Sequence, residues 1–203
     1  QGSISGGPVD DKSPELVTVS PNNFYADLSS KEKIIISFDE LVDPISARSS
    51  VSILNQEFKI KVKGKKLVIS PINEWEEGRL IEIYFDRKLS DYQNNTIDVP
   101  INLIYSMDGY IPKNIIHGKI IDINNEVAIF NKEEYEEIFD VAIYQVTDST
   151  LNLIKVVQSD RNLNFKFSAL KEGIYRIACV QGPLIDIGLD QSSKRYSICS
   201  KDI

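Results

Sequence analysis

Few residue types in this sequence could carry out acid–base, nucleophilic or metal chemistry, and their spacing does not favour catalysis. A Ser-His-Asp or Cys-His arrangement needs a histidine beside a nucleophile. The single histidine, His117, lies in a strand-like run next to Gly118. No nucleophile-elbow motif surrounds any serine. We therefore interpret His117 as a satisfied or solvent-facing strand residue, and we expect no enzymatic activity, no cofactor and no small-molecule substrate. A concave pocket holding His117 beside a carboxylate or thiol would favour an enzyme instead.

Metal-ligating residues are present, but not at the spacing of known metal motifs. Structural zinc takes closely spaced ligands, whereas Cys179 and Cys199 are well separated from each other and from His117. Two acidic stretches do not match the oxygen-ligand pattern of a calcium loop. We interpret them as a solvated helix and as a turn, and predict no metal site. These stretches are Glu133-Glu134-Tyr135-Glu136-Glu137 and Asp91-Tyr92-Gln93-Asn94-Asn95.

The sequence allows two states for the two cysteines. Cys179 and Cys199 each lie in an apolar, β-like run near the end of the chain. They could pair as a disulfide between neighbouring strands, or they could be buried free thiols. A disulfide would indicate an oxidising compartment.

Three aromatic residues are candidates for stacking on a sugar or a peptide. Trp75, Tyr92 and Tyr110 lie in or beside turn-like segments. In a β domain most aromatic side chains belong to the core or cover a sheet edge, so this ligand role stands beside a structural one. The Gly6-Gly7 pair has neither a preceding strand nor a following helix, which excludes a phosphate-binding loop.

Composition and charge exclude several classes of protein. The chain has 203 residues, 42% of them apolar and 26% charged, which suits one or two packed domains. Its net charge of −7 repels phosphate backbones, and no basic stripe is visible along the sequence, so we expect no nucleic-acid binding. No apolar stretch approaches the roughly 20 residues that span a bilayer. The N-terminus lacks the features of a signal peptide, so the chain is either cytosolic or already processed.

Short strands with period-two alternation follow a Gly-rich leader over residues 1–12. Within 80–85, Ile81, Ile83 and Phe85 face one way, while Glu82 and Tyr84 face the other. One short helix is expected over 131–139, with Asn131 as its N-cap. Regularly spaced short strands with turn residues between them predict an all-β sandwich or barrel. The expected strands are 16–19, 33–38, 51–54, 58–62, 66–69, 80–85 and 97–105, then, after a boundary at 107–114, 115–123, 139–146, 151–158, 164–167, 174–180 and 195–199.

The first half resembles the bacterial Ig-like domain first described in S-layer proteins. The resemblance lies in SPELVTVSP over 13–21, IIISFDELVD over 34–43 and LVISP over 67–71. The turn LSDYQNN over 89–95 fits the last element of the pattern, with Asn94 where the family prefers glycine. Asparagine also accepts a positive φ, so we expect the turn to be kept.

The second half is similar to the carboxypeptidase-regulatory-like, transthyretin-type β-sandwich. IHGKIID over 116–122 resembles its opening strand, and SDRNLNFKFSALKEGIYRI over 159–177 resembles its central signature. Leu163 replaces the usual glycine, so we expect that turn to bend differently. The two resemblances imply an all-β protein of two consecutive sandwiches, over 13–106 and 115–203, joined by a linker over 107–114.

That domain order after a glycine-rich leader resembles a group of Gram-negative envelope lipoproteins. The resemblance implies a lipidated cysteine preceding Gln1, hence a membrane anchor. The segment Gln1-Gly2-Ser3-Ile4-Ser5 lacks the acidic residues of surface-export signals, which favours the periplasmic face of the outer membrane. We expect a non-catalytic subunit that contacts an integral outer-membrane β-barrel protein in transport, secretion or biogenesis. A glycan-binding or adhesive surface module is the alternative.

Overall fold

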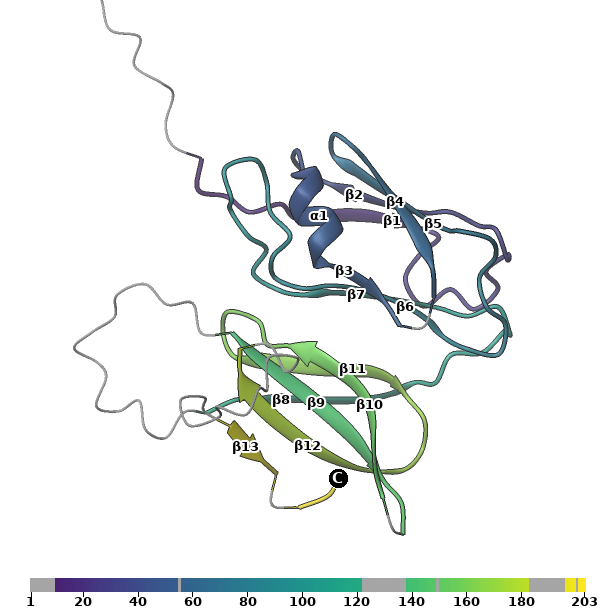
Figure 1. The fold of residues 1–203 in the computed structure, drawn as a ribbon, viewed down its shortest axis with the longest axis vertical. Coiled ribbons are helices and arrows are strands. Elements are labelled where there is room, and N and C mark those ends of the chain that lie inside the picture. The colour runs from purple at the N-terminus through teal and green to yellow at the C-terminus, as the bar shows by residue number, and fades with distance from the viewer. Residues whose placement is uncertain (1–9, 55, 122–137, 149, 183–195, 200) are drawn as a thin grey trace, which may run out of the picture.

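The computed structural model describes residues 10–54, 56–121, 138–148, 150–182, 196–199 and 201–203, and within them the protein is almost entirely β. Figure 1 shows two units, one above the other. Within the described residues, no strand before residue 106 shares a sheet with a strand after it. The expected all-β class of stacked antiparallel sheets is confirmed.

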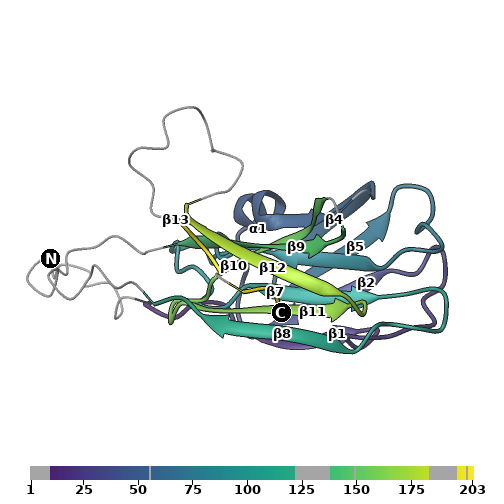
Figure 2. The ribbon, with the colours of Figure 1, turned by 90° about the horizontal axis from the view of Figure 1, so that it is seen from below.

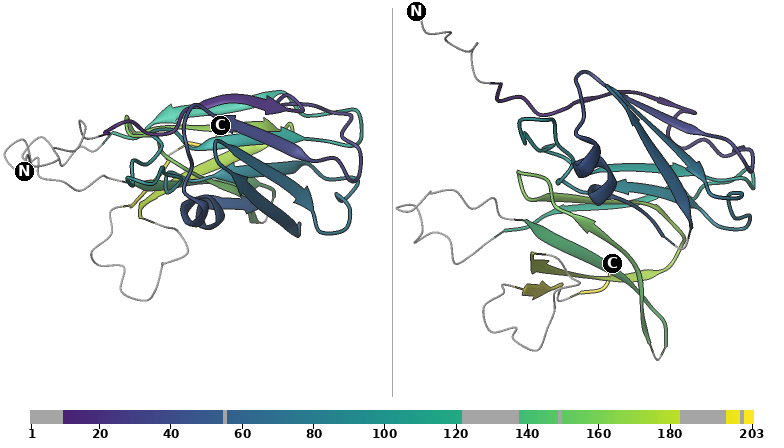
Figure 3. Two further views of the ribbon diagram at one scale, coloured as in Figure 1. Left: turned by 90° about the horizontal axis from the view of Figure 1, so that it is seen from above. Right: turned by 45° about the horizontal axis from the view of Figure 1, so that its top comes forward.

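The N-terminal unit is a sandwich of two sheets. We call the first the outer sheet: its order is β1-β2-β5-β4, formed by β1 (Leu16–Ser20), β2 (Ile34–Phe38), β5 (Lys66–Pro71) and β4 (Phe58–Lys63). We call the second the inner sheet: its order is β3-β6-β7, formed by β3 (Val51–Ile53), β6 (Ile81–Phe85) and β7 (Ile101–Tyr105). The inner sheet lies between the outer sheet and the second unit, and Figure 3 shows the two N-terminal sheets facing each other.

Strand alternation fills the space between these two sheets. Every second residue of β2, β5 and β6 is buried, including Ile34, Ile69 and Ile83 at 0% exposure. Burying such side chains stabilises a fold by about 1.5–3 kcal/mol each. The cluster extends beyond the strands to Trp75, whose indole nitrogen donates to the Glu32 carbonyl at 2.8 Å.

A short helix that the sequence analysis did not anticipate, α1 (Pro44–Ser50), follows β2. Its N-cap is Asp43, whose carboxylate accepts a hydrogen bond from the Ser46 amide at 2.7 Å. Pro44 at the first helical position fixes φ where no amide donor is needed. Ala47 and Ser50 are buried, so packing holds this two-turn helix.

The C-terminal unit has a four-stranded sheet and a separate strand pair. The sheet order is β10-β9-β12-β13, with β10 (Leu151–Gln158), β9 (Phe139–Val146), β12 (Ile174–Gln181) and β13 (Tyr196–Ile198); the pair is β11 (Asn164–Leu170) with β8 (Asn114–Lys119). Figure 2 shows β13 alongside β12. The expected strands 139–146 and 151–158 are confirmed to the residue. The expected helix over 131–139 lies outside the described residues except for Ile138 and Phe139, and Phe139 begins β9.

Two turns adopt the left-handed conformation where glycine would be usual. Asn94 has φ +69°, which agrees with the expectation for that turn. Leu163 has φ +63°, so the turn after β10 keeps the glycine-like conformation instead of bending differently. Asp160 holds that turn, because its Oδ1 accepts from the amides of Asn162 and Asn164, both at 2.8 Å.

Polar contacts join the two units along the polar side of β6, the side of Glu82 and Tyr84. Lys155 of β10 donates to both carboxylate oxygens of Glu82, at 2.8 and 2.9 Å, and to the Ser168 carbonyl at 2.8 Å. The Gln158 amide donates to the Tyr84 hydroxyl oxygen at 2.6 Å, and Gln158 Oε1 accepts from the Arg87 amide at 2.8 Å. Burial raises the pKa of Tyr84 above its usual range. The alternation expected within 80–85 is confirmed, and its polar side forms the junction between the units.

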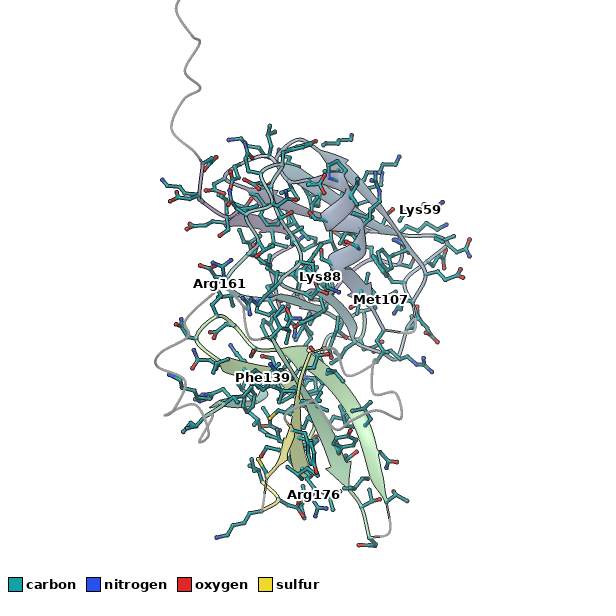
Figure 4. The ribbon with its side chains drawn as sticks, turned by 60° about the vertical axis from the view of Figure 1, so that its left-hand side comes forward. Lys59, Lys88, Met107, Phe139, Arg161 and Arg176 are labelled. Atoms are coloured by element: carbon teal, nitrogen blue, oxygen red, sulfur yellow. The ribbon has the colours of Figure 1, made fainter. Side chains whose placement is uncertain are left out.

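Two further contacts close the junction. Ile104, Ile111 and Ala169 form a small buried cluster, against which Ala26 and Leu80 pack. Arg161 lies between the units in Figure 4; its Nε is 2.8 Å from Asp98 Oδ1 and its Nη2 donates to the Thr96 carbonyl at 3.1 Å. The connecting segment is therefore packed, since Ile111 is only 7% exposed.

α1 is the one helix of the described residues, and at seven residues it is too short to cross a bilayer.

Candidate binding site

A groove opens at the junction, between the edge of the inner sheet and the strand pair β8–β11. Its volume is about 750 Å³. The N-terminal unit contributes the loop before β2 and the start of β7, and the C-terminal unit contributes the exposed face of β8 and β11. We call this the junction groove. The residues that line it include Asn23, Phe24, Asn102, His117, Lys119, Asp160, Asn164, Phe165, Lys166 and Ser168.

Phe24 is the most unusual residue of the groove. Its φ is +63°, a left-handed conformation that is rare for an aromatic residue, and its side chain is 45% exposed. Asn23 holds this conformation: its Oδ1 accepts from the amides of Phe24 at 2.9 Å and Ile104 at 2.8 Å. A strained backbone that presents an apolar ring to solvent is typical of a binding position.

Asn102 lies between Asn23 and the C-terminal unit and has an unused hydrogen-bonding atom. Its carbonyl accepts from Asn23 Nδ2 at 3.0 Å, but its side-chain Oδ1 is buried without a partner. A buried acceptor without a donor costs about 1–3 kcal/mol.

The opposite wall is basic. His117 and Lys119 on β8 are opposite Lys166 and Asn164 on β11, and all four are exposed. Behind them Gly118 is opposite Phe165, and a Cβ at Gly118 would lie 2.6 Å from the Phe165 ring. Glycine is therefore required for the ring to cross β8. The wall combines an apolar base with two ammonium groups, so it suits an extended, partly acidic ligand.

The groove contains a histidine, a carboxylate and a hydroxyl, but they do not form a catalytic arrangement. Asp160 Oδ1 is occupied by the amides of Asn162 and Asn164, and its Oδ2 accepts from Asn164 Nδ2 at 3.0 Å. Within the described residues, no hydrogen bond or ion pair joins His117 to Asp160 or to Ser168. Activation of a serine needs such a contact between nucleophile and base.

The junction groove continues along the open side of the N-terminal sandwich. Two further hollows, of about 490 and 350 Å³, lie between β1 and β7. The larger shares Asn23, Val99, Pro100 and Asn102 with the junction groove, and the smaller shares Asn23. Both β1 and β7 are at the end of their sheets. Together these hollows form a long channel beside two sheet edges.

The three aromatic residues that the sequence offers as ligand contacts differ in exposure and position. Trp75 is 2% exposed in the core of the N-terminal sandwich, so its expected contact with a ligand is wrong: the ring fills the space beside β2. Tyr92 and Tyr110 are 61% and 66% exposed, but neither lines the groove or its continuation. Their ligand role stays a prediction.

Cys179 and Cys199 are free thiols in the structure. Cys179 is on β12 opposite Ser197, and the Cys199 amide bonds to the Ile177 carbonyl. The register therefore sets the two cysteines diagonally, at a Cβ separation longer than the roughly 3.5–4.5 Å that a disulfide needs. Burial raises the pKa of the Cys179 thiol. Pairing would require β13 to shift, and it stays a prediction.

Three carboxylates meet near the 91–95 turn. Oxygens of Asp10, Glu40 and Asp91 lie within 4.8 Å of one another. Asp91 uses its Oδ1 for the amides of Gln93 and Asn95, and its Oδ2 accepts from Asn95 Nδ2. Burial, followed by Asp91 and Asp10, raises the pKa of Glu40. We interpret the cluster as a charged turn and assign it no ligand.

Sequence reasoning did not find Phe24, Asn23 or Asn102. The segment 20–23 reads as a strand-ending turn, and the sequence does not indicate that Asn23 side-chain bonds to β7 hold Phe24 in a left-handed conformation. The cluster Pro21-Asn22-Asn23 was the available signal, because asparagine often hydrogen-bonds nearby backbone.

Comparison with known proteins identifies the first unit. The model of the bacterial Ig-like domain family matches residues 10–106. No curated protein matches the chain. Two solved structures are weakly similar. An L,D-transpeptidase from Mycobacterium smegmatis has 11% identity, a TM-score of 0.33, and covers 72% of this chain and 73% of its own. The MG0-NIE-MG1 region of native alpha-2-macroglobulin from Escherichia coli has 13% identity, a TM-score of 0.34, and covers 92% and 71%.

Neither structural likeness bears on function at these scores. The match over 10–106 agrees with the sandwich of β1 to β7 and with the motifs at 13–21, 34–43 and 67–71. Residues 10–106 of this protein are thus similar to the bacterial Ig-like domain in both sequence pattern and sheet arrangement.

Proposed function

We propose that this protein is a non-catalytic, lipid-anchored accessory subunit of an outer-membrane protein complex, and that it binds an extended segment of a partner in the junction groove. In this proposal the C-terminal unit is a carboxypeptidase-regulatory-like sandwich, the body lies on the periplasmic side, and the partner is an integral β-barrel protein. The resemblances of the two halves support the envelope assignment. The observation that carries the binding role is Phe24, an exposed aromatic ring held in a strained conformation at the groove.

The shape of the groove favours a peptide. It runs beside β7 and along the exposed residues of β8 and β11, so an extended segment would fit in it. The outer backbone groups of β7 at Asn102 and Ile104 already bond to residues 23 and 24, so side-chain contacts would supply most of the affinity. Phe24 and Phe165 would contact the apolar side chains of the segment, and Lys119 and Lys166 would attract acidic ones. Because the two units are joined by buried contacts, both walls are held in place before the partner arrives, which lowers the entropic cost of binding.

A pull-down in mild detergent from native membranes, followed by mass spectrometry, tests the proposal. The wild-type protein should recover a β-barrel protein in stoichiometric amount. Phe24→Ala should reduce that recovery strongly, because aromatic anchors dominate interface energies. Tyr92→Ala is the control, since it removes an aromatic ring that is also exposed but lies outside the groove.

Two outcomes would contradict this function. Recovery of the protein alone from an intact, well-extracted membrane would exclude a stable complex. Equal recovery by wild type and Phe24→Ala would exclude the groove as the contact. Circular dichroism of each variant confirms that a loss of recovery does not come from unfolding.

A glycan-binding or adhesive module is the second candidate. The groove residues near Phe24 include Asn164, whose exposed side chain uses only its Nδ2 in bonds to Asp160, and an amide beside an aromatic ring is suited to sugar hydroxyls. This candidate predicts that the isolated protein binds an oligosaccharide from a glycan array and that Phe24→Ala abolishes the binding. With Trp75 in the core, Phe24 takes the place expected for that residue.

A further inference from the structure

The exposed face of the outer sheet carries a cluster of lysines that the sequence analysis missed. Lys59, Lys61 and Lys63 occupy every second position of β4, and all three are exposed. Lys66 of β5 is opposite Lys63, and Lys33 immediately precedes β2 in phase with exposed Ile35. We call these five residues the lysine face. No basic stripe is apparent along the sequence, because apolar residues separate most of the lysines; the strand period of two brings them to one side.

This face is unusual in an acidic protein. The chain has 30 acidic and 23 basic residues, yet acidic residues are absent from β1, β2, β4 and β5. Among the ion pairs of the described residues, none involves a member of the lysine face. These ammonium groups are therefore available to an external anion.

Protection of a sheet edge does not account for the whole face. Lysine on an edge strand discourages aggregation, and β4 is an edge strand. Lys66, however, is on the neighbouring strand and directly opposite Lys63, where two like charges repel and weaken the pairing. An edge-protecting device does not need that second, unfavourable charge.

We propose that the lysine face docks on the anionic surface of a lipid bilayer. A flat ladder of ammonium groups fits a surface of phosphate headgroups, and Ile35, at 38% exposure, and half-buried Val68 lie between the charges, where they can meet the interfacial region. Lysine and arginine both contact nucleic-acid phosphates, but surfaces that read or stack on bases add arginine and aromatic rings. Among its strand residues this face has neither: Thr18, Ser20, Ile35, Ser37, Lys59, Lys61, Lys63, Lys66, Val68 and Ser70.

The architecture suits such docking. The outer sheet is on the side of the N-terminal unit away from the C-terminal unit, as Figure 1 shows, and Lys59 projects from the flank of the N-terminal unit in Figure 4. A membrane under the lysine face would leave the second unit directed away from the bilayer. This inference goes beyond the proposed function and does not depend on it, because the two surfaces share no residue.

Flotation of the full chain, without any partner, on vesicles tests the inference. The protein should float with vesicles of phosphatidylcholine and phosphatidylglycerol in equal parts, but not with phosphatidylcholine alone. Raising NaCl from about 0.05 M to about 0.5 M should release it, because screening shortens the range of the attraction. The variant K59Q/K61Q/K63Q should partition about 10- to 100-fold more weakly, since each lysine near an anionic surface contributes a several-fold gain.

The matched control is K113Q/K171Q/K201Q, which makes the same change in net charge with exposed lysines of the connecting segment and the C-terminal unit. It should float like the wild type. The thermal melt of K59Q/K61Q/K63Q should equal or exceed that of the wild type, because repulsion from Lys66 is relieved. The inference is overturned if the wild type fails to float, floats equally with neutral vesicles, or loses flotation equally in both triple variants. Binding to duplex DNA without flotation would overturn it in favour of another polyanion.

Discussion

The two units differ in how they are stabilised. The N-terminal sandwich has a contiguous core of 17 buried apolar residues between two sheets. The described part of the C-terminal unit has seven, and Tyr84 of the N-terminal unit packs among them. The second unit thus includes a side chain from the first in its own core. The first sandwich should fold by itself, whereas the second depends on the junction.

A single fluorescent residue can distinguish the unfolding of the two units in solution. The protein has one tryptophan, Trp75, and it is buried in the N-terminal core. Its fluorescence therefore reports the unfolding of the first sandwich, while far-ultraviolet circular dichroism reports both. A difference between the two transitions measures how far the second unit can unfold alone.

The largest effects come from removing a buried ring in each unit. Phe85→Ala and Phe167→Ala each delete a side chain with 0% exposure and should cost about 3–5 kcal/mol. Phe85 is adjacent to Tyr84 on β6, so its loss should lower both transitions. Phe167→Ala should lower the circular dichroism transition and leave the Trp75 transition nearly unchanged. Equal shifts of both probes in both variants would contradict the asymmetry.

A smaller effect is expected from the ion pair at the junction. Lys155→Met leaves the Glu82 carboxylate and the Ser168 carbonyl without their partner, and the side chains of Lys155 and Glu82 are only 12% and 23% exposed. We expect a loss of about 2 kcal/mol, below the 3–5 kcal/mol of a fully buried pair. The double variant Glu82→Gln/Lys155→Met should recover part of that loss, because no unpaired charge remains. Additive single effects would show that the pair does not couple the units.

Removal of one hydroxyl group gives a finer test. Tyr84→Phe deletes the acceptor of the Gln158 amide and should cost about 1–2 kcal/mol, mainly in the second unit. Tyr105→Phe is the matched control, since its hydroxyl donates to the Pro21 carbonyl within the N-terminal unit at 3.1 Å. The control should shift the Trp75 transition, and Tyr84→Phe should not. Denaturant titration with both probes measures the two effects.

Features that depend on local sequence patterns could be predicted from the sequence, whereas contacts between the two units could not. Short apolar runs bounded by turn residues located the strands 139–146 and 151–158, and period-two alternation identified the polar side of β6, because both signals are local. They could not indicate that this polar side would meet a second unit. The sequence analysis missed α1 because seven residues contain too little periodicity, although Asp43-Pro44 is a helix-start signal.

The binding residues were less predictable than the fold. Trp75 was selected for its type, but exposure decides whether an aromatic ring can bind a ligand, and exposure depends on tertiary packing. Phe24 becomes notable only through the bonds of Asn23 to the distant strand β7. Both features result from long-range contacts that one sequence does not contain. Four of the five lysines of the lysine face lie in the β4–β5 hairpin, where the strand period and the turn are local, and only the place of Lys33 beside them depends on the pairing of β2 with β5.

The smallest effect concerns the C-terminal end, where the second unit is completed by an exposed contact. Arg176 donates to both carboxylate oxygens of Asp202, at 2.7 and 3.0 Å, and this bond holds the pKa of Asp202 below its usual range. A carboxyl group with a lowered pKa in the folded state stabilises that state above its unfolded pKa of about 3.9. That contribution is lost as the pH falls through the folded pKa. Asp202→Asn should therefore lower the melting temperature slightly at pH 7, and the difference from wild type should disappear in acid. Hydrogen exchange should locate the change at the Tyr175 and Ile203 amides, which bond to each other's carbonyls at 2.9 Å. A difference that persists unchanged in acid would show that Asp202 stabilises the folded state through packing and not through its charge.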